Sequence, residues 1–515
     1  MERLNVLLTG ATGTMGKSTL DLLLKENLVK VTVFSLDSKK DRKILKTYQE
    51  NNQVSIIWGD LRDYNDVLTA IKDIDIILHL AALVSPLADA YPELAMEINF
   101  GGTLNLIQAI EKEKRQNDIY FVYIGTVAQT GDRMPPIHWG RVGDPIKPSI
   151  YDYYAVSKVA AERIVIESKI KNWVSLRQTG IMGQNMTKIL DPIILHNPLN
   201  NVLEYVSDRD SGILLKNLVL QIAEKKLNPD FWGHIYNIGG GSSCRINSLE
   251  LYANSFAKLG IDNMQDLFKA NWFATRNFHG QYYLDSDKLE NYLHFRNDDI
   301  NYFYESFEKS YGFKAKLGRF LSKLPILQTI MKSVIHRSFK KLALHKSGTL
   351  KALNDMNQAA INAFWSSLDK WEEIPPKIND FQAFKAWDEV IHINHGYDER
   401  KAKSELSLED LQKAAEFRGG SCLSQKMNIG AWKDKLAFKC AFGHEFKASP
   451  RLVLEGGHWC PVCEDKSWNY VERAKKDPFF AQVWYPLHSE NKKNFEYEKI
   501  ITSAKIEEKF LKKQK

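Results

Sequence analysis

The N-terminal part of the chain alternates between short apolar runs and stretches with helical spacing. The apolar runs, which predict buried strands, are residues 5–9, 31–34, 55–58, 74–80, 120–124 and 174–176. The stretches that predict helices include residues 17–25, 64–71, 102–114 and 154–169. Strands that alternate with helices in this way form a parallel sheet covered by helices on both faces. The predicted fold class is therefore α/β, with a doubly wound parallel sheet.

A glycine-rich turn joins the first predicted strand to the first predicted helix. It reads TGATGTMG and contains Gly10, Gly13 and Gly16. Glycine lets the backbone turn tightly and lets its N–H groups approach a pyrophosphate at the helix N-terminus. A glycine triplet alone is a weak signal, but its place between strand and helix predicts a Rossmann-type dinucleotide-binding turn. The other residues expected to line the cofactor here are Thr12, Thr14 and Met15.

The spacing TGxxGxxG resembles that of the extended short-chain dehydrogenase/reductase family, which includes NAD-dependent epimerases and dehydratases. Three later segments resemble the family in the same order: GDLRD at residues 59–63, HLAA at residues 79–82 and NFGGTLNL at residues 99–106. The resemblance covers roughly residues 3–300. It implies that Asp60 contacts the adenine, with Leu61 beside it, and that Ala81 and Ala82 let the diphosphate and ribose pass close.

The end of the second predicted strand bears on the choice of dinucleotide. An acidic residue there would bind the ribose 2′-hydroxyl of NAD. The sequence VFSLDSKKDRK places Ser35 at this point, with Lys39 and further cations beyond it. A hydroxyl with nearby cations suits a 2′-phosphate, so we favour NADP(H) over NAD(H). Asp37 would favour NAD if it took the place of Ser35, and the lysines alternatively form a solvated loop.

Tyr154 and Lys158 are four residues apart in a predicted helix, so they share one face of it. The family pairs such residues with a Ser or Thr at the end of the fifth strand, a position that Thr126 holds here. The resemblance therefore implies a catalytic triad of Thr126, Tyr154 and Lys158. Tyr154 would exchange a proton with the substrate oxygen, and Thr126 would hydrogen-bond that oxygen. Lys158 would hold the nicotinamide ribose and, as a cation, would lower the tyrosine pKa from about 10.

The triad predicts an NAD(P)-dependent oxidoreductase, but several reactions share it. Related dehydratases carry an acidic residue directly after the Ser or Thr, whereas Val127 and Ala128 follow here. The segment ILDPIILHNPLNNVLEYV is apolar, and the later half of this region offers little for a diphosphate clamp beyond Arg209. We therefore predict reduction of a ketone or aldehyde, or oxidation of the alcohol, of a fairly hydrophobic substrate. A redox-neutral sugar-nucleotide epimerase with tightly held NAD is the alternative, and a non-catalytic NADP-sensing protein is the third.

The segment FKCAFGHEFKASPRLVLEGGHWCPVC contains two close pairs of soft and imidazole ligands. The four predicted ligands are Cys440, His444, Cys460 and Cys463. Such pairs supply the tetrahedral set that zinc prefers, and four protein ligands leave no open position. The segment resembles treble-clef or zinc-ribbon modules, so we predict a structural Zn²⁺. Cys422 and His458 are spare candidates.

Composition divides the chain into three expected parts: residues 1–310 with the dinucleotide-binding sheet and a small substrate lobe, residues 311–418 as a basic helical region and linker, and residues 419–515 as the zinc module. Residues 310–354 contain no Asp or Glu, while Lys and Arg recur among Leu, Ile and Phe. Residues 314–351 therefore form a basic amphipathic stretch, broken near Pro325. Such a stretch fits an anionic membrane surface, an anionic substrate such as an acyl-CoA, or a solvated face.

The hydrophobic fraction of 44% and the charged fraction of 26% are those of a globular protein. No apolar run approaches the ~18 residues that span a bilayer, and the N-terminus lacks the pattern of a signal peptide. We therefore expect a cytoplasmic protein. The net charge of +7 is mild, and the loop between the two ligand pairs holds only Lys447 and Arg451, so nucleic acid is not an expected partner. The family resemblance implies a homodimer through the helices that carry the Tyr–Lys pair.

Overall fold

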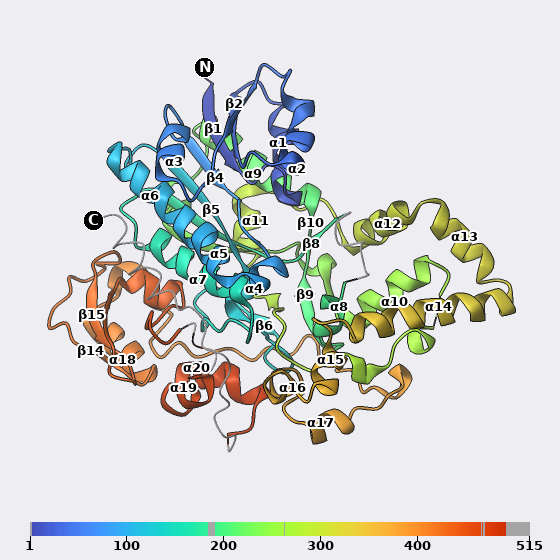
Figure 1. Ribbon diagram of the computed structural model, residues 1–515. Coiled ribbons are helices and arrows are strands. Elements are labelled where there is room, and N and C mark those ends of the chain that lie inside the picture. Colours follow the sequence, from blue (N-terminus) through green and yellow to red (C-terminus); the bar gives the residue numbers. More distant parts are fainter. Residues whose placement is uncertain (1–2, 184–190, 262, 465, 467–468, 491–515) are drawn as a thin grey trace.

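The computed structural model describes residues 3–183, 191–261, 263–464, 466 and 469–490, so residues 491–515 of the predicted zinc module lie outside the described residues. Its centre is a seven-stranded parallel sheet with the order β11-β7-β5-β4-β1-β2-β3 (Figure 1). The strands are β1 (Leu4–Thr9), β2 (Val29–Ser35), β3 (Val54–Trp58), β4 (Ile76–His79), β5 (Tyr120–Thr126), β7 (Asn172–Gln178) and β11 (His234–Ile238). The predicted Rossmann-type α/β fold is confirmed.

The strand order reverses between β1 and β4, because the chain passes from β1 to β2 and β3 on one side and from β4 to β5 on the other. Ligands of such sheets bind outside the carboxyl ends of the strands at this reversal. Thr9 pairs with His79 in the sheet register, so the segments that follow them leave the sheet side by side. The Thr9 hydroxyl oxygen ties them together, since it accepts hydrogen bonds from the N–H groups of Leu80 and Ala81, both at 3.1 Å.

Alternate residues of the buried strands face two helical layers. In β1, Leu7 belongs to one hydrophobic cluster, while Val6 and Leu8 belong to another. The first layer contains α3 (Tyr64–Ala70), α6 (Gly102–Lys112) and α7 (Tyr153–Ile166). The second contains α1 (Thr14–Leu23), α9 (Asp208–Ala223) and α11 (Asp287–Leu293). Strands buried on both faces explain why the sequence reads as continuous apolar runs.

A mainly helical region follows the sheet. Its helices are α10 (Ser248–Lys258), α12 (Ile300–Tyr311), α13 (Phe313–Leu321), α14 (Pro325–Ala343), α15 (Thr349–Asn354), α16 (Gln358–Trp365) and α17 (Leu368–Glu372). The predicted break near Pro325 is confirmed, because α13 ends at Leu321 and proline occupies the first turn of α14, where its missing N–H costs nothing. Shorter elements are α2 (Lys39–Leu45), α4 (Leu87–Ala90), α5 (Pro92–Ala95), α8 (Ile193–His196), β6 (Trp139–Gly140), β8 (Ile181–Met182), β9 (Val202–Glu204), β10 (Val206–Ser207), β12 (Arg245–Asn247) and β13 (Tyr282–Tyr283).

The C-terminal module surrounds a three-stranded antiparallel sheet. Its elements are α18 (Leu408–Phe417), β14 (Ser421–Cys422), β15 (Leu436–Lys439), β16 (Glu445–Ala448), α19 (Tyr470–Lys476) and α20 (Pro478–Trp484). Phe438, Leu452 and Trp459 of this module share one hydrophobic cluster with Val165 and Ile166 of α7. The module is therefore packed onto the first helical layer (Figure 1). None of the described helices is long and apolar enough to cross a membrane.

Candidate active site and candidate metal centre

Two glycines of the turn, Gly10 and Gly16, have no room for a side chain, whereas Gly13 has room for one. Gly10 has a φ of +74°, and a Cβ there would lie 2.7 Å from the Ala81 nitrogen. A Cβ on Gly16 would lie 2.1 Å from the Gly10 oxygen, so both positions exclude any side chain. A Cβ on exposed Gly13 would meet only the Gly10 oxygen, at an ordinary 3.4 Å. The space over Gly13 is therefore open at the start of α1, whose N-terminus has no side-chain cap.

This open helix N-terminus fits a pyrophosphate, which needs N–H donors and close backbone approach. No acidic residue lies in the first turn of α1 to oppose an anion. The three other residues predicted to line the turn differ in their surroundings. Thr12 and Thr14 are half-buried, whereas Met15 is 6% exposed and packs in the hydrophobic cluster beneath. Met15 therefore offers the backbone, not the side chain, to a ligand.

The region predicted to select the dinucleotide contains an ion pair. Ser35 is the last residue of β2, as predicted, and Lys39 is the exposed first residue of α2. Asp37 and Arg42 form a bidentate ion pair, in which the hydrogen bonds from Arg42 lower the pKa of Asp37. Asp37 could bind the ribose 2′-hydroxyl of NAD, and Arg42 could bind the 2′-phosphate of NADP. Because the two side chains pair with each other, the pair favours neither dinucleotide. NADP(H) preference stays a prediction.

The segment after β3 places Asp60 and Leu61 on opposite sides of the chain. The Asp60 carboxylate accepts hydrogen bonds from the Arg62 guanidinium, the shortest at 2.6 Å. Leu61 is 8% exposed and would contact a Cβ on Gly102 at 2.9 Å, so it packs against α6. Ala81 and Ala82 directly follow Leu80, beside the glycine turn. The adenine contact predicted for Asp60 would require Arg62 to share this carboxylate.

The predicted triad comes together at the carboxyl edge of the sheet. Thr126 ends β5, and Tyr154 and Lys158 lie in the first two turns of α7. The side chains of Thr126 and Tyr154 are hydrogen-bonded. Lys158 is only 3% exposed, and its ammonium lies 4.1 Å from the centre of the Tyr123 ring. The aromatic face thus supports a cation that has no access to water.

Burial is the largest cause of the pKa shifts of Tyr154 and Lys158. Burial raises the pKa of Tyr154 to about 12, although the hydrogen bond from Thr126 opposes the increase. Burial lowers the pKa of Lys158 to about 7, although the Glu162 carboxylate opposes the decrease. Our expectation that Lys158 lowers the pKa of Tyr154 is therefore wrong for this structure. A lysine that is about half protonated at neutral pH is a weaker electrostatic partner than a full cation.

A buried polar network lies behind the triad, which sequence reasoning missed. Glu162, one turn after Lys158, accepts hydrogen bonds from Gln129 at 2.9 Å, from Ser175 at 2.6 Å and from Arg177 at 2.7 Å. The Gln129 side-chain oxygen accepts the N–H of Thr126 at 3.1 Å. The network therefore fixes the strand end that carries Thr126 relative to the helix that carries Tyr154. A local pattern does not reveal it, because its members come from β5, the turn that follows it, α7 and β7.

A cavity of about 550 Å³ opens at the N-terminal end of α7. Its apolar lining includes Ile150, Ile193, Phe278 and Phe364, and its polar lining includes Asp89, Asp152, His196 and His279. Burial and the neighbouring Asp152 raise the pKa of Asp89 to about 6. Tyr151 and Asp152, which lead into α7, lie on the wall. This is the candidate substrate cavity, because it borders the helix that presents Tyr154.

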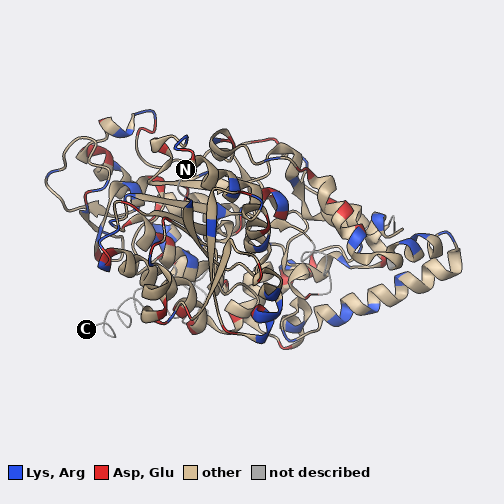
Figure 2. Cartoon of the chain, turned by 90° about the horizontal axis from the view of Figure 1, so that it is seen from above, with Lys and Arg blue, Asp and Glu red and all other residues tan. Residues whose placement is uncertain are grey.

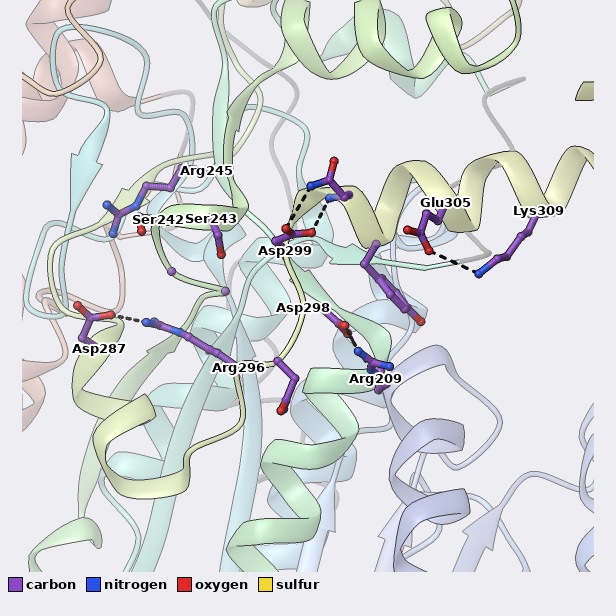
Figure 3. A pocket seen from close by; sticks show the side chains of 15 residues that line it. Arg209, Ser242, Ser243, Arg245, Asp287, Arg296, Asp298, Asp299, Glu305 and Lys309 are labelled. Atoms are coloured by element: carbon purple, nitrogen blue, oxygen red, sulfur yellow. Dashed lines mark hydrogen bonds and ion pairs between the residues drawn. The ribbon is translucent and has the colours of Figure 1, made fainter. Parts of the chain in front are cut away.

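A larger hollow of about 910 Å³ lies elsewhere, between the start of α9 and the start of α12 (Figure 3). Arg209, Arg245, Arg296 and Lys309 line it. Each of these cations meets a carboxylate. Figure 3 shows the pairs Arg209–Asp298, Arg296–Asp287 and Lys309–Glu305, and Arg245 pairs with Glu204. Neither this lining nor that of the 550 Å³ cavity contains a triad residue. The larger hollow does not border the start of α7, however, and its charges cancel, so we assign no ligand to it.

The predicted metal ligands form one cluster. The ligand atoms of Cys440, His444, Cys460 and Cys463 all lie within 4.8 Å of one another. The distance from the Cys440 Sγ to the Cys463 Sγ is 3.9 Å, and those from the His444 Nδ1 to the three sulfurs are 3.2–3.7 Å. A zinc tetrahedron with bonds of ~2.3 Å to sulfur and ~2.0 Å to nitrogen has edges of ~3.5–3.8 Å. The cluster therefore fits a tetrahedral zinc ion.

The two spare candidates lie outside this cluster. Cys422 belongs to β14 and is half-buried. His458 is fully buried, and its two ring nitrogens lie 3.0 Å from carboxylate oxygens of Glu162 and Glu464. His458 thus joins the metal module to the network behind the triad instead of binding the metal.

The same module packs on the C-terminal half of α7, whereas Val156 and Ala160 in its N-terminal half pack against Met96 and Phe100. The Arg163 guanidinium donates to the Trp459 carbonyl and pairs with Glu464, and the Ser449 hydroxyl donates to Glu167. No residue of Tyr153–Ile166 is exposed. A homodimer through α7, which the family resemblance implies, would need this module to move away.

Comparisons with known proteins match part of this chain. Residues 6–211 match the profile of the NAD dependent epimerase/dehydratase family. The chain is similar to UDP-glucose 4-epimerase of Rickettsia bellii, with 34% identity over 109 residues, which are 20% of this chain and 32% of the relative. It is also similar to mouse 3 beta-hydroxysteroid dehydrogenase type 7, with 28% identity over 190 residues, which are 35% of this chain and 50% of the relative. The chain thus spans from about one third to one half of the length of these relatives.

Solved structures to which the chain is similar include dTDP-glucose 4,6-dehydratase of Bacillus anthracis in complex with NAD. The TM-score is 0.47 and the identity 18%, over 61% of this chain and 98% of that one. UDP-glucuronic acid 4-epimerase of Bacillus cereus in complex with NAD has a TM-score of 0.45 and 19% identity, over 61% of this chain and 100% of that one.

The switch-point glycine turn and the Thr–Tyr–Lys site define a dinucleotide-binding α/β domain of the short-chain dehydrogenase/reductase type. The profile match agrees with this class. The predicted resemblance is thus confirmed for residues 6–211, which match the model of the NAD dependent epimerase/dehydratase family.

Proposed function

We propose that the protein is an NAD(P)-dependent oxidoreductase that reduces a ketone or aldehyde of a fairly hydrophobic substrate, or oxidises the corresponding alcohol. The observation that carries this proposal is the hydrogen-bonded Thr126–Tyr154 pair at the carboxyl edge of the sheet, with Lys158 on the same helix. The nicotinamide of a dinucleotide whose pyrophosphate lies at the glycine turn would supply or accept the hydride beside the triad.

The residues of the chain would manage the proton. With its pKa raised to about 12, Tyr154 is a neutral phenol near pH 7 and can donate a proton to a carbonyl oxygen. Thr126 can donate a hydrogen bond to the oxygen that gains charge. Lys158 can replace the proton that Tyr154 gives up, because a group with a pKa of about 7 readily donates and accepts near neutral pH.

The cavity favours an uncharged substrate over a nucleotide sugar. Its described lining contains four aspartates, Asp89, Asp152, Asp191 and Asp355, but only two lysines and no arginine. One of these lysines, Lys351, is already paired with Asp355. A diphosphate would face net negative charge there, whereas Ile150, Ile193, Phe278 and Phe364 offer apolar contact. This is why we place a redox-neutral sugar-nucleotide epimerase second and a non-catalytic NADP-sensing protein third.

Identification of the nucleotide released from freshly purified, denatured protein separates these functions. A net oxidoreductase exchanges its cofactor in every turnover, so we expect largely empty protein that then binds NADPH more tightly than NADH. An epimerase keeps the hydride on the enzyme between two half-reactions. Stoichiometric NAD(H) would therefore support the epimerase and contradict the NADP(H) preference.

We also propose that Cys440, His444, Cys460 and Cys463 bind a structural Zn²⁺. The distances among their ligand atoms match the edges of a zinc tetrahedron, and three of the four residues are buried. Four protein ligands leave no position for a reacting water. Metal analysis of protein purified without chelator should find one zinc per chain.

A further inference from the structure

Helices α13 and α14 form a projecting arm, which we define as residues 313–343 (Figure 1). The arm turns back at Pro325, which begins α14. Seen from above, α14 reaches outward from the body of the protein and carries Lys and Arg without any Asp or Glu (Figure 2). The arm itself therefore carries one charge sign, although Arg319 pairs with Glu308 and Lys332 with Asp266 of neighbouring elements.

Large apolar side chains are exposed on both helices near the turn. On α13 and its end they are Phe313 (76% exposed), Leu317 (41%), Phe320 (62%) and Leu324 (43%). On α14 they are Ile326 (77%), Leu327 (37%), Ile330 (54%) and Val334 (56%). Spacings of three and four residues place them in one stripe along each helix. Clustered exposed apolar side chains mark a docking surface, because water solvates them poorly.

The inner face of α14 is already used in packing. Phe339 is buried, with its ring centre 4.1 Å from that of Phe268, and Met331 and Ile335 pack against the same cluster. The exposed stripe is therefore a second apolar face, and the folded core does not need it. A helix in a globular protein usually exposes polar residues on that side.

The exposed cations lie where they can contact lipid phosphates. On the described side chains of this region, Lys316, Lys323, Arg337, Lys340, Lys341 and Lys346 are exposed. On α14, Arg337 and Lys341 continue the stripe of Ile326, Ile330 and Val334 toward the body of the protein. On α14 the exposed apolar side chains thus lie nearest the turn, and Arg337, Lys340 and Lys341 lie farther from it. Lys323 lies at the turn itself, where its long side chain can extend to a lipid phosphate.

We propose that the arm docks on an anionic lipid bilayer. The apolar side chains around Pro325 enter the boundary between headgroups and acyl chains, and the lysines and arginines bind lipid phosphates. A nucleic acid would satisfy the cations but would leave the apolar stripe in water. A second copy of the arm would bring equal charges together without a carboxylate to compensate them. An anionic bilayer satisfies both features.

The arm also leads to the candidate substrate cavity. Shortly after α14 ends at Ala343, residues His345, Lys346, Ser347 and Gly348 line that cavity. A docked arm would therefore keep the cavity within about the length of α14, ~27 Å, of the bilayer surface, where an apolar alcohol or ketone accumulates. This consequence rests on the proposed function, whereas the docking itself does not.

Flotation with lipid vesicles tests the docking on the full-length protein. We expect binding to phosphatidylcholine vesicles that contain about 30 mol% phosphatidylglycerol, weak binding to pure phosphatidylcholine, and release as NaCl rises from about 0.1 to 0.5 M. Ile326→Glu should weaken binding about tenfold or more. Ile429→Glu is the matched control, because Ile429 in the C-terminal module is 73% exposed and the charge change is the same.

The outcomes separate the candidate partners. The proposal would be overturned if Ile326→Glu and Ile429→Glu lost vesicle binding equally. It would also be overturned if the wild-type protein bound vesicles with and without anionic lipid equally well. Tight binding of duplex DNA that Ile326→Glu leaves unchanged, or a dimer that only Ile326→Glu disrupts, would overturn it too. Fluorescence titration with NADPH in the same samples measures dinucleotide binding, which tests the proposed function and not the docking. A protein that floats with vesicles but binds no dinucleotide would contradict that function and leave the docking intact.

Discussion

Replacement of Lys158 by methionine tests whether burial depresses the pKa of this lysine. The pKa in the folded chain is about 7, against 10.5 for the ordinary side chain. Between these values the unfolded chain binds a proton at Lys158 that the folded chain does not, so wild-type stability rises with pH across this window. Below pH 7 both states are protonated, and the full cost of the buried charge, ~4–5 kcal/mol, is present.

The magnitude follows from these two pKa values. At pH 7 the lysine costs the folded state ~4 kcal/mol relative to an uncharged side chain, and at pH 9.5 it costs ~1.4 kcal/mol. The variant also loses the contact between the Lys158 ammonium and the Tyr123 ring, which lowers its advantage in unfolding free energy by up to ~2 kcal/mol. Lys158→Met should therefore be more stable than wild type by ~2–4 kcal/mol at pH 7, and the difference should shrink by ~3 kcal/mol at pH 9.5.

Urea unfolding at several pH values between about 7 and 9.5 measures this difference. Lys169→Met is the control, because Lys169 is exposed just after α7 and its curve should run parallel to that of wild type. Parallel curves for Lys158→Met and wild type would refute the depressed pKa, and with it the proposal that Lys158 resupplies the proton of Tyr154.

Three further predictions concern the cofactor, the proton and the metal. Tyr154→Phe should lower turnover about 10²–10⁴-fold with NADPH binding unchanged, as fluorescence titration would verify, and normal turnover would exclude Tyr154 as the proton donor. Gly13→Ala should fold normally, because its Cβ has room, yet bind NADPH at least about tenfold more weakly. Gly16→Ala should lose ~2 kcal/mol or more of unfolding free energy, because its Cβ meets the Gly10 oxygen at 2.1 Å, and equal stability of the two variants would contradict this difference. Cys440→Ser should abolish zinc binding and lower the melting temperature, whereas Cys422→Ser should retain one zinc per chain, and retention of zinc by both would refute the proposed ligand set.

The sequence was sufficient to predict those features that depend on residues close to one another along the chain. Gly16 is fixed by backbone contacts within one turn, and Tyr154 and Lys158 share a face because a helix repeats every 3.6 residues. Gly10 has a positive φ in that turn, and the backbone of Ala81 also excludes a side chain there. The spacing of Cys440 with His444, and of Cys460 with Cys463, likewise follows from two tight turns. Buried strands can also be predicted from the sequence, because a short apolar run between two helical patterns is typical of a strand in a parallel sheet.

Tertiary structure decided how the separate parts act on one another. The sequence predicted that Lys158 lowers the pKa of Tyr154, but burial of both side chains reversed the expectation, and burial is a property of the whole fold. His458 resembled a spare metal ligand, yet folding places it between Glu162 and Glu464.

The sequence by itself determined a dinucleotide-binding sheet, a triad and a ligand set, because each depends on neighbours along the chain. Only the tertiary structure decided that the C-terminal module packs on the C-terminal half of α7, that one end of the basic region lines the candidate substrate cavity, and that the rest projects as an arm with its apolar side chains in water. Contacts between residues hundreds of positions apart depend on the packing of whole surfaces, and no local pattern encodes such packing.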